Sequence, residues 1–251
     1  MPTALVTGPT AGIGAEFAVQ LAAAGHDLVL VARRADRLAA LAERLRSRHG
    51  VQAEVLVADL AEPADLDRVV TRLTDPDRPI DLLVNNAGFG LTGSFLDRDI
   101  AADLRMLDVL VRAPLVLTRA AVPPMVARGS GAVLNVSSVA GFLPRGTYGA
   151  SKAWLTSFTE GLAALLAGTG VRAMALCPGW VRTEFHTRGD IDSTDYPSVS
   201  WVPVDRLVSA ALADLAAGKV VSIPTPLWKV VSAGLRLAPR ALIRRFAQQR
   251  R

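Results

Sequence analysis

The 251-residue chain has one cysteine and three histidines. Cys177 has no partner within the chain for a disulfide, and His26, His49 and His186 are too scattered to form a metal-ligand cluster. No run reaches the roughly 18 uncharged apolar residues of a membrane-spanning helix, and no basic region precedes the first apolar run. We therefore expect a cytoplasmic protein without a metal site.

Acidic residues are missing from residues 216–251, where all eight charged side chains are basic. Residues 1–215 carry 20 basic and 23 acidic side chains, a net charge of −3, so the excess of basic charge belongs to the C-terminal segment. A protein that binds nucleic acid needs a basic stripe on its folded body. The charge distribution therefore argues against a nucleic-acid partner.

Hydrophobic residues make up 51% of the chain and charged residues 20%, which excludes a disordered chain and allows a sizeable core. Short apolar runs rich in β-branched residues alternate with helix-length amphipathic segments, a pattern typical of βαβ units around a parallel sheet. We expect strands at residues 3–7, 27–32, 53–58, 80–85, 131–136, 171–177 and 220–223. We expect helices at residues 12–24, 35–48, 63–73, 97–125, 147–167 and 204–216.

These elements predict an α/β fold of the Rossmann type, a doubly wound, seven-stranded parallel sheet flanked by helices. No break rich in Pro, Gly or Ser and no internal repeat divides the pattern, so we expect a single domain over residues 1–223. Residues 183–203 are polar and irregular, and they are long enough to form a lid. Residues 224–251 form a basic, amphipathic C-terminal extension.

A glycine-rich turn follows the first expected strand and opens the first helix. Gly8, Gly12 and Gly14 have the spacing G-x-x-x-G-x-G, with Thr10 and Ile13 between them. Glycine permits positive φ angles and a close approach of phosphate to the backbone, and the helix N-terminus supplies N–H donors. The turn fits the pyrophosphate of a dinucleotide, although by itself it is equally compatible with a plain tight turn.

Arg33 and Arg34 stand at the end of the second expected strand, where a site selective for NAD usually has an acidic residue for the ribose 2′-hydroxyl. A guanidinium there pairs with a 2′-phosphate, which favours NADP over NAD. Asp36 is better explained by the dipole of the following helix. The alternative is that both arginines are solvated side chains at a helix start.

Tyr148 and Lys152 lie four residues apart at the start of an expected helix, so their side chains share one face. We expect the nearby ammonium to lower the pKa of the phenol, because it attracts the phenolate. Ser138 follows the fifth strand at the sheet edge where ligands bind, and its hydroxyl can donate to a substrate oxygen. The alternative is a surface tyrosine and lysine on an ordinary helix.

With these motifs in order, the chain resembles the classical short-chain dehydrogenase/reductase family over residues 1 to about 223. The resemblance rests on motifs at successive strand ends: Thr7–Gly14, Asp59-Leu60, Asn85-Asn86-Ala87-Gly88, Ser138, Tyr148 with Lys152, and Pro178-Gly179 followed by Val181 and Thr183. It implies that the glycine turn and these strand-end residues, together with Arg33 and Arg34, hold the cofactor. Asp59 would contact adenine, Asn86 would steady the ribose region, and Thr183 would hold the carboxamide.

The resemblance also implies an NADP-dependent oxidoreductase that exchanges a hydride with a carbonyl compound or an alcohol. Tyr148 would donate and accept the proton, Lys152 would bind the nicotinamide ribose and tune the phenol, and Ser138 would orient the carbonyl. A homodimer or homotetramer is the corresponding expectation for the assembly.

The chain departs from the family pattern at two places. Leu110 stands where the family has an asparagine that supports a proton relay, and its side chain can neither donate nor accept a hydrogen bond. The interval from Ser138 to Tyr148 is about three residues shorter than the family's, so we expect a tight loop between them. Leu110 leaves open a slow enzyme or a cofactor-binding sensor or scaffold, and the same Tyr-Lys pair could serve epimerase or dehydratase chemistry.

Phe89, Phe142, Leu143 and Trp180 lie beside motif residues at strand ends, so they are candidates for an apolar substrate wall or for ordinary packing. We therefore expect a hydrophobic ketone, aldehyde or secondary alcohol as substrate. After Pro239, three apolar residues, Leu242, Ile243 and Phe246, share one face of an expected basic helix. Such a helix suits packing on its own domain or on a second subunit better than contact with a membrane surface.

Overall fold

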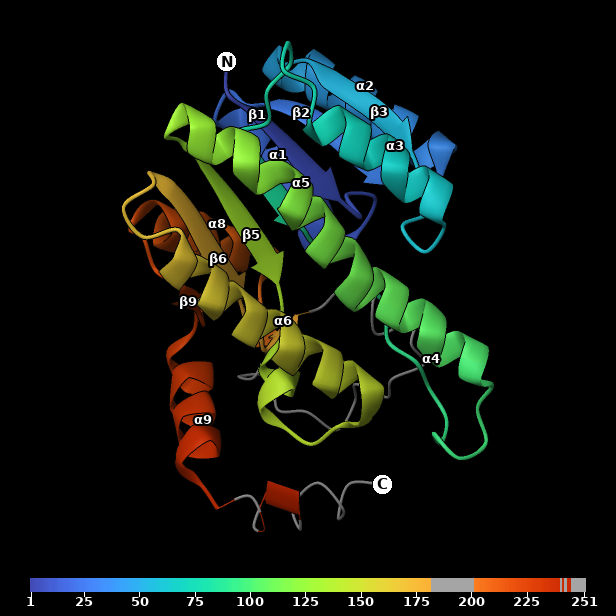
Figure 1. The fold of residues 1–251 in the computed structure, drawn as a ribbon, viewed down its shortest axis with the longest axis vertical. Helices are drawn as coiled ribbons and strands as arrows, with labels where there is room; N and C mark the ends of the chain where they lie inside the picture. The colour runs from blue at the N-terminus through green and yellow to red at the C-terminus, as the bar shows by residue number, and fades with distance from the viewer. Residues whose placement is uncertain (182–200, 240, 242, 245–251) are drawn as a thin grey trace.

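The computed structural model describes residues 1–181, 201–239, 241, 243 and 244. Its main sheet has seven parallel strands in the order β3-β2-β1-β4-β5-β6-β9 (Figure 1). The strands are β1 (Thr3–Thr7), β2 (Asp27–Ala32), β3 (Ala53–Val57), β4 (Leu82–Asn85), β5 (Gly131–Val136), β6 (Val171–Leu176) and β9 (Val221–Ser222). This order confirms the predicted doubly wound Rossmann-type sheet. The strand order reverses between β1 and β4, so a crevice for a ligand opens beyond their carboxyl ends.

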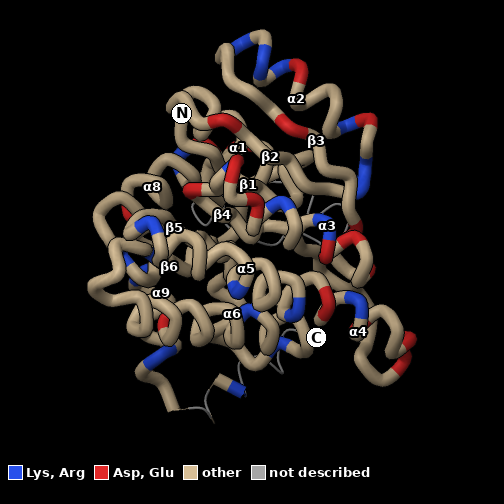
Figure 2. The backbone as a smooth tube through the Cα atoms, turned by 45° about the horizontal axis from the view of Figure 1, so that its top comes forward, with Lys and Arg blue, Asp and Glu red and all other residues tan. Residues whose placement is uncertain are grey.

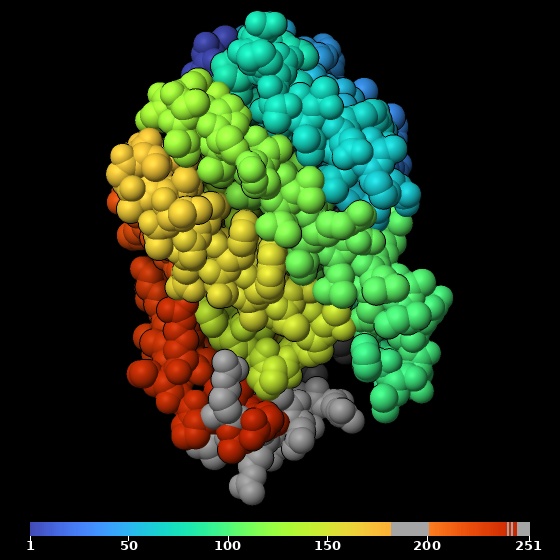
Figure 3. Space-filling view, viewed as in Figure 1, coloured from blue at the N-terminus to red at the C-terminus, as the bar shows by residue number. Residues whose placement is uncertain are grey.

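Helices cover both faces of the sheet. One face carries α1 (Gly12–Ala23), α2 (Ala35–His49) and α8 (Val204–Ala216), and the other carries α3 (Pro63–Leu73), α5 (Ala113–Arg128) and α6 (Gly146–Leu165). Figure 3 shows α5 and α6 side by side across the second face, with the segment around α4 (Ile100–Leu107) projecting at the lower right. Figure 2 shows acidic and basic residues interspersed along α2 and α3.

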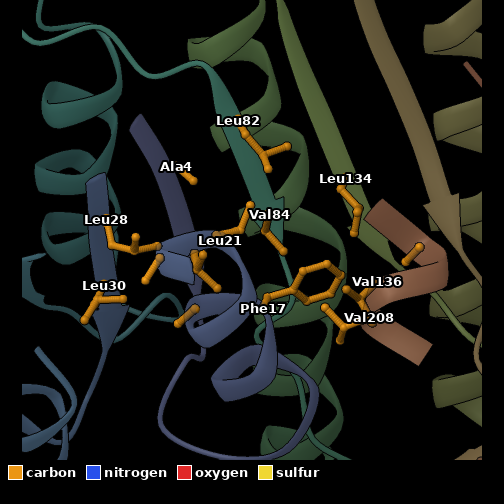
Figure 4. Packing of buried hydrophobic residues seen from close by; sticks show 14 of the residues in the cluster. Ala4, Phe17, Leu21, Leu28, Leu30, Leu82, Val84, Leu134, Val136 and Val208 are labelled. Atoms are coloured by element: carbon orange, nitrogen blue, oxygen red, sulfur yellow. The ribbon is translucent and has the colours of Figure 1, made fainter. Parts of the chain in front are cut away.

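The core forms because the central strands are predominantly apolar on both sides, as a sheet covered by helices on both faces requires. Leu5 and Val84 are fully buried in the central strands β1 and β4. On one face, Phe17 of α1 points toward Val136 of β5 and Val208 of α8 (Figure 4). This packing holds the carboxyl ends of the central strands, and the segments that follow them, at one edge of the sheet.

The predicted helix over residues 97–125 is wrong in its start and in its continuity. Asp99 accepts a hydrogen bond from the Ala101 amide and caps α4, so the helix begins at Ile100. A π-helical turn, η1 (Asp108–Arg112), then separates α4 from α5. Pro114 has no N–H to donate to the carbonyl of Leu110, which explains why regular α-helical bonding is interrupted there.

Four further elements were not predicted. Strands β7 (Trp180–Val181) and β8 (Trp201–Val202) form a small parallel pair, and a 3₁₀ turn, η2 (Val139–Phe142), follows β5. Helix α9 (Pro226–Leu237) lies in the C-terminal extension ahead of Pro239, beside the lower end of the sheet in Figure 1. Residues 183–200 of the predicted lid lie outside the described residues, as do Leu242 and Phe246. Ile243 is buried.

Candidate active site

The glycine turn between β1 and α1 depends on positions that exclude a side chain. Gly8 and Gly12 have φ angles of 67° and 55°, in the left-handed region that favours glycine. A Cβ atom on Gly14 would lie 2.3 Å from Asn86 Nδ2 and from the Gly8 carbonyl oxygen. No side chain caps α1, and its first turn has no acidic residue, so its positive end can receive an anion. The turn therefore fits a pyrophosphate.

Asn86, just beyond β4, holds this turn in place. Its Nδ2 atom donates to the carbonyl oxygens of Thr7, at 2.9 Å, and Gly8, at 3.1 Å. The Thr7 hydroxyl oxygen in turn accepts from the backbone amides of Asn86 and Ala87, at 2.9 and 3.0 Å. The amide nitrogen of Asn86 is thus committed to the protein backbone. Its contribution to a ribose site is to fix the shape of the turn.

The two arginines after β2 have different surroundings. Arg34 pairs with Asp36 through two hydrogen bonds of 2.7 and 3.3 Å. Arg33 is exposed, and its Nη1 atom lies 3.9 Å from Asp59 Oδ2 at the end of β3. Of the two side chains, Arg33 is therefore better placed to receive a 2′-phosphate, while Arg34 and Asp36 brace the start of α2.

Three polar side chains meet beyond the carboxyl end of β5. Ser138 and Tyr148 are hydrogen-bonded to each other. The Lys152 ammonium lies 5.8 Å from the centroid of the Tyr148 ring, one helical turn along α6. Lys152 also donates to the carbonyl oxygen of Val136, the last residue of β5, at 2.7 Å. The phenol, the ammonium and the serine hydroxyl thus converge at the edge of the sheet where the resemblance places them.

Burial sets the protonation of this cluster. It raises the pKa of Tyr148 to about 12, and the hydrogen bond with Ser138 opposes that rise. The expectation that the ammonium would lower this pKa is therefore wrong, because removal of the phenolate from water is the larger effect. Burial also lowers the pKa of Lys152 to about 8, because the ammonium is removed from water. At neutral pH the site holds a phenol that can donate a proton, beside an ammonium.

Ser138 is oriented by the turn that begins after it. The residue caps η2, and its Oγ atom accepts from the Ala140 amide at 3.1 Å. The hydroxyl hydrogen stays available for donation, because this contact uses only an oxygen lone pair. The short interval to Tyr148 is spanned by η2, residues 143–145 and the first two residues of α6, which confirms the expected tight loop.

Leu110 fills the space beside Lys152 with an apolar group. A Cβ atom on Gly88 would lie 2.8 Å from Leu110 Cδ2 and 3.9 Å from Lys152 Nζ, so the leucine and the lysine flank the same glycine. Leu110 is 1% exposed and stands in the π-helical turn η1. The side of the lysine pocket where the family has an asparagine is therefore apolar in this chain.

A buried hydroxyl network supports α6 beneath the three polar groups, and sequence motifs did not single it out. Ser137 Oγ donates to the Lys152 carbonyl oxygen at 2.7 Å and lies 2.7 Å from Thr156 Oγ1. Thr156 Oγ1 is 3.7 Å from Cys177 Sγ, and burial raises the pKa of this thiol, so it is neutral at physiological pH. The Ser137-Ser138 pair in the sequence was the available signal: one serine faces the pocket and the other holds the helix.

Helix α9 was not predicted, yet it covers the loops around the site. The ring of Trp228 lies directly against Gly179, since a Cβ atom there would be 2.0 Å from Trp228 Nε1. The Arg236 guanidinium lies over the Phe142 ring, 4.6 Å from its centroid. Trp180 and Trp201 form a further aromatic pair with centroids 6.0 Å apart.

The other predicted residues lie at the same sheet edge or in the core beside it. Leu60 and Val181 are buried core residues, and Ile13 packs against the core from α1. The Pro178 carbonyl oxygen accepts from the Val139 amide at 3.0 Å, which joins the end of β6 to η2. Thr10 is half-buried in the glycine turn. Thr183 lies outside the described residues. Among the described residues, no helix is both long and apolar enough to cross a membrane.

The chain is similar to proteins of one enzyme family. The family model described as short chain dehydrogenase matches residues 2–192. A short chain dehydrogenase of Pseudocercospora fijiensis is 39% identical over 197 residues, which are 76% of this chain and 63% of that protein. The match therefore spans less than two thirds of the fungal relative.

Two solved structures cover nearly the whole chain. A short-chain dehydrogenase from Sphingobium yanoikuyae in complex with NADPH has a TM-score of 0.86 and 40% identity, over 94% of each chain. The bulky-bulky ketone specific alcohol dehydrogenase from Comamonas testosteroni has a TM-score of 0.81 and 33% identity, over 96% of each chain. The similarity to both structures extends beyond residue 192, where the matched family model ends.

Proposed function

The chain belongs to the short-chain dehydrogenase family, and we propose that it transfers a hydride between NADP and a hydrophobic ketone or aldehyde, or the corresponding secondary alcohol. The observation that carries the proposal is the meeting of Ser138, Tyr148 and Lys152 at one sheet edge. A protein that only binds a dinucleotide has no need of this arrangement, so the cluster favours turnover over a sensor or scaffold.

Each of the three side chains has a distinct task in this proposal. Bound NADPH supplies the hydride. Ser138 donates a hydrogen bond to the substrate oxygen, and Tyr148 gives its proton to that oxygen as negative charge develops there. The raised pKa of Tyr148 keeps the phenol protonated for reduction. The Lys152 ammonium stabilises the phenolate that remains and is positioned to bind ribose hydroxyls.

NADP is the proposed cofactor, with the glycine turn as the pyrophosphate site and Arg33 as the 2′-phosphate site. The support is the exposed Arg33 guanidinium after β2, together with the NADPH bound by the Sphingobium relative. We expect Arg33→Ala to weaken NADPH binding about tenfold and to leave NADH binding nearly unchanged, measured by calorimetry. Equal affinities for the two cofactors in both proteins would contradict the choice of NADP.

A hydrophobic carbonyl compound is the proposed substrate class. Phe142 follows Ser138 by four residues in η2, and the Trp228 ring lies against Gly179, three residues beyond β6, so these aromatic groups are candidates for an apolar substrate wall. The ketone specificity of the Comamonas relative adds support by similarity. A carbonyl panel tests this assignment: aliphatic and aromatic ketones should outrank small polar sugars.

We further propose a homodimer or homotetramer formed through the outer faces of α5 and α6. Trp154 and Phe158 stack on α6 with ring centroids 5.0 Å apart, and Leu165 of the same helix is exposed. Apolar groups gathered on one helix face are typical of a subunit interface. Light scattering should give a mass of at least two chains for the protein, and a smaller mass for Leu165→Glu.

The decisive variant for the proposed chemistry is Tyr148→Phe. Loss of the hydroxyl removes the proton donor while the ring and its packing remain, so we expect turnover to fall by about 10²–10⁴-fold. The assay follows NADPH absorbance with a ketone panel, and calorimetry checks that NADPH still binds. Turnover that persists in Tyr148→Phe would contradict the assigned role.

A further inference from the structure

We infer that Arg105 is a cofactor-specificity residue that acts through Asp59: it pairs with this carboxylate and thereby lets Arg33 serve a 2′-phosphate. The inference rests on the proposed NADP site. Arg105 belongs to α4, which is distant from the glycine turn in the sequence, and no sequence motif included it.

Three side chains from three different elements form the cluster. Arg105 Nη2 donates to Asp59 Oδ2, and its Nη1 atom lies 3.6 Å from Glu62 Oε1. Arg33 Nη1 lies 3.9 Å from the same Asp59 Oδ2 atom. The other oxygen of Asp59 accepts from the Ala61 amide at 3.1 Å. The Asp59 carboxylate is thus held by the Ala61 amide and by Arg105. Arg33 lies at the outer limit of ion-pair distance from it.

The position of Asp59 creates an electrostatic conflict that Arg105 resolves. A carboxylate this close to Arg33 competes with a phosphate for the guanidinium, and it also repels the phosphate directly. Because Arg105 hydrogen-bonds the shared Oδ2 atom, it offsets the negative charge and draws the carboxylate toward α4. Arg33, whose side chain is 65% exposed, then has its charge available for a phosphate from solvent.

Neighbouring arginines do not duplicate this contact. Arg34 is paired with Asp36. Arg112, on the π-helical turn, donates to the carbonyl oxygen of Ala61 at 2.7 Å and pairs with Asp108, so it supports the loop after β3 without neutralising Asp59. Loss of Arg105 would therefore leave Asp59 facing Arg33 alone.

The experiment measures dissociation constants of NADPH and NADH by calorimetry for the full-length protein and for Arg105→Met. Methionine keeps much of the length and the apolar packing of the arginine and removes its charge. We expect NADPH affinity to fall about tenfold with little change for NADH, so that the ratio of the two constants collapses. Arg44→Met is the matched control, because it removes an exposed arginine from the C-terminal half of α2 and should leave both constants unchanged.

A second background tests whether Arg105 acts through Asp59. In Asp59→Asn the carboxylate charge is absent, so adding Arg105→Met should have less than a twofold effect on the NADPH constant. If Arg105→Met weakens NADPH equally in both backgrounds, or spares the NADPH-to-NADH ratio in the natural background, the inference is overturned. Failure of the NADP proposal would give a different result, because the protein without substitutions would then bind NADPH no better than NADH.

Discussion

The cofactor side and the substrate side of this site are constructed in different ways. The glycine turn consists of backbone, held by Asn86 and by glycines at which a side chain would collide with neighbouring atoms. The proposed substrate side consists of side chains from η2, α6 and α9, which come from distant parts of the sequence. Backbone geometry leaves few choices of residue, whereas an aromatic wall can be formed by many sequences.

This contrast explains why the glycine turn can be predicted from the sequence, whereas the composition of the proposed substrate side cannot. It also predicts how each side responds to substitution. A change in the glycine turn should affect every substrate equally, because it acts on the cofactor. A change in the aromatic wall should alter preference among substrates and leave cofactor binding intact.

The largest effect is expected from Gly14→Ala. The added Cβ atom would meet Asn86 Nδ2 and the Gly8 carbonyl oxygen at 2.3 Å, so either the turn or Asn86 must move. We expect NADPH affinity to fall about 100-fold or more, with a lower melting temperature. Calorimetry measures the first effect and thermal denaturation the second. Gly234→Ala is the control, because nothing lies within 4 Å of a Cβ atom there.

The second-largest effect is the pH dependence of the reduction rate, which reports on the catalytic groups Tyr148 and Lys152. Lys152 is an ammonium below its pKa of about 8 and neutral above it, whereas Tyr148, with a pKa of about 12, stays a phenol throughout. Ketone reduction should therefore fall about tenfold for each pH unit above roughly pH 8. In Lys152→Arg, whose guanidinium stays charged, the residual rate should lack this decline. If the rate declines above pH 8 in both proteins, the titrating group is not Lys152.

Trp228→Ala tests the substrate side alone. Its ring lies on Gly179, so truncation should raise KM for bulky aromatic ketones about fivefold and change KM for small ketones little. NADPH affinity should not change. Val230→Ala, at a residue that is 73% exposed on the same helix, is the control. An equal rise in KM for all substrates would indicate that Trp228 acts on the cofactor and not on the substrate.

The smallest effect is expected from Leu110→Asn. An amide beside Gly88 and Lys152 would restore a polar group to the lysine pocket, so we expect the turnover rate to rise about threefold. The same change buries a polar group in place of a 1% exposed leucine, so stability should fall by about 1–3 kcal/mol. Leu110→Ala should lose stability without gaining rate. Equal rates for both variants would show that this pocket has no part in proton movement.

Strands, the glycine turn and the Tyr148–Lys152 pair could be predicted because each follows from local pattern: apolar periodicity, turn chemistry and helical spacing. The break in the long helix at Pro114 was missed, although a proline in the interior of the expected helix has no N–H to donate and was an available signal. The role of Arg105 and the packing of Trp228 on Gly179 depend on contacts between distant segments. The raised pKa of Tyr148 was missed because burial is a property of the folded chain.

The most direct test of the account follows a single hydrogen. NADPH carrying deuterium on one face of nicotinamide C4, and separately on the other, is mixed with a hydrophobic ketone, and the alcohol is examined by mass spectrometry. We predict one deuterium on the carbinol carbon from only one of the two labelled cofactors, with product formation lost in Tyr148→Phe. Alcohol without deuterium from either cofactor, or formed at an undiminished rate by the variant, would contradict the account.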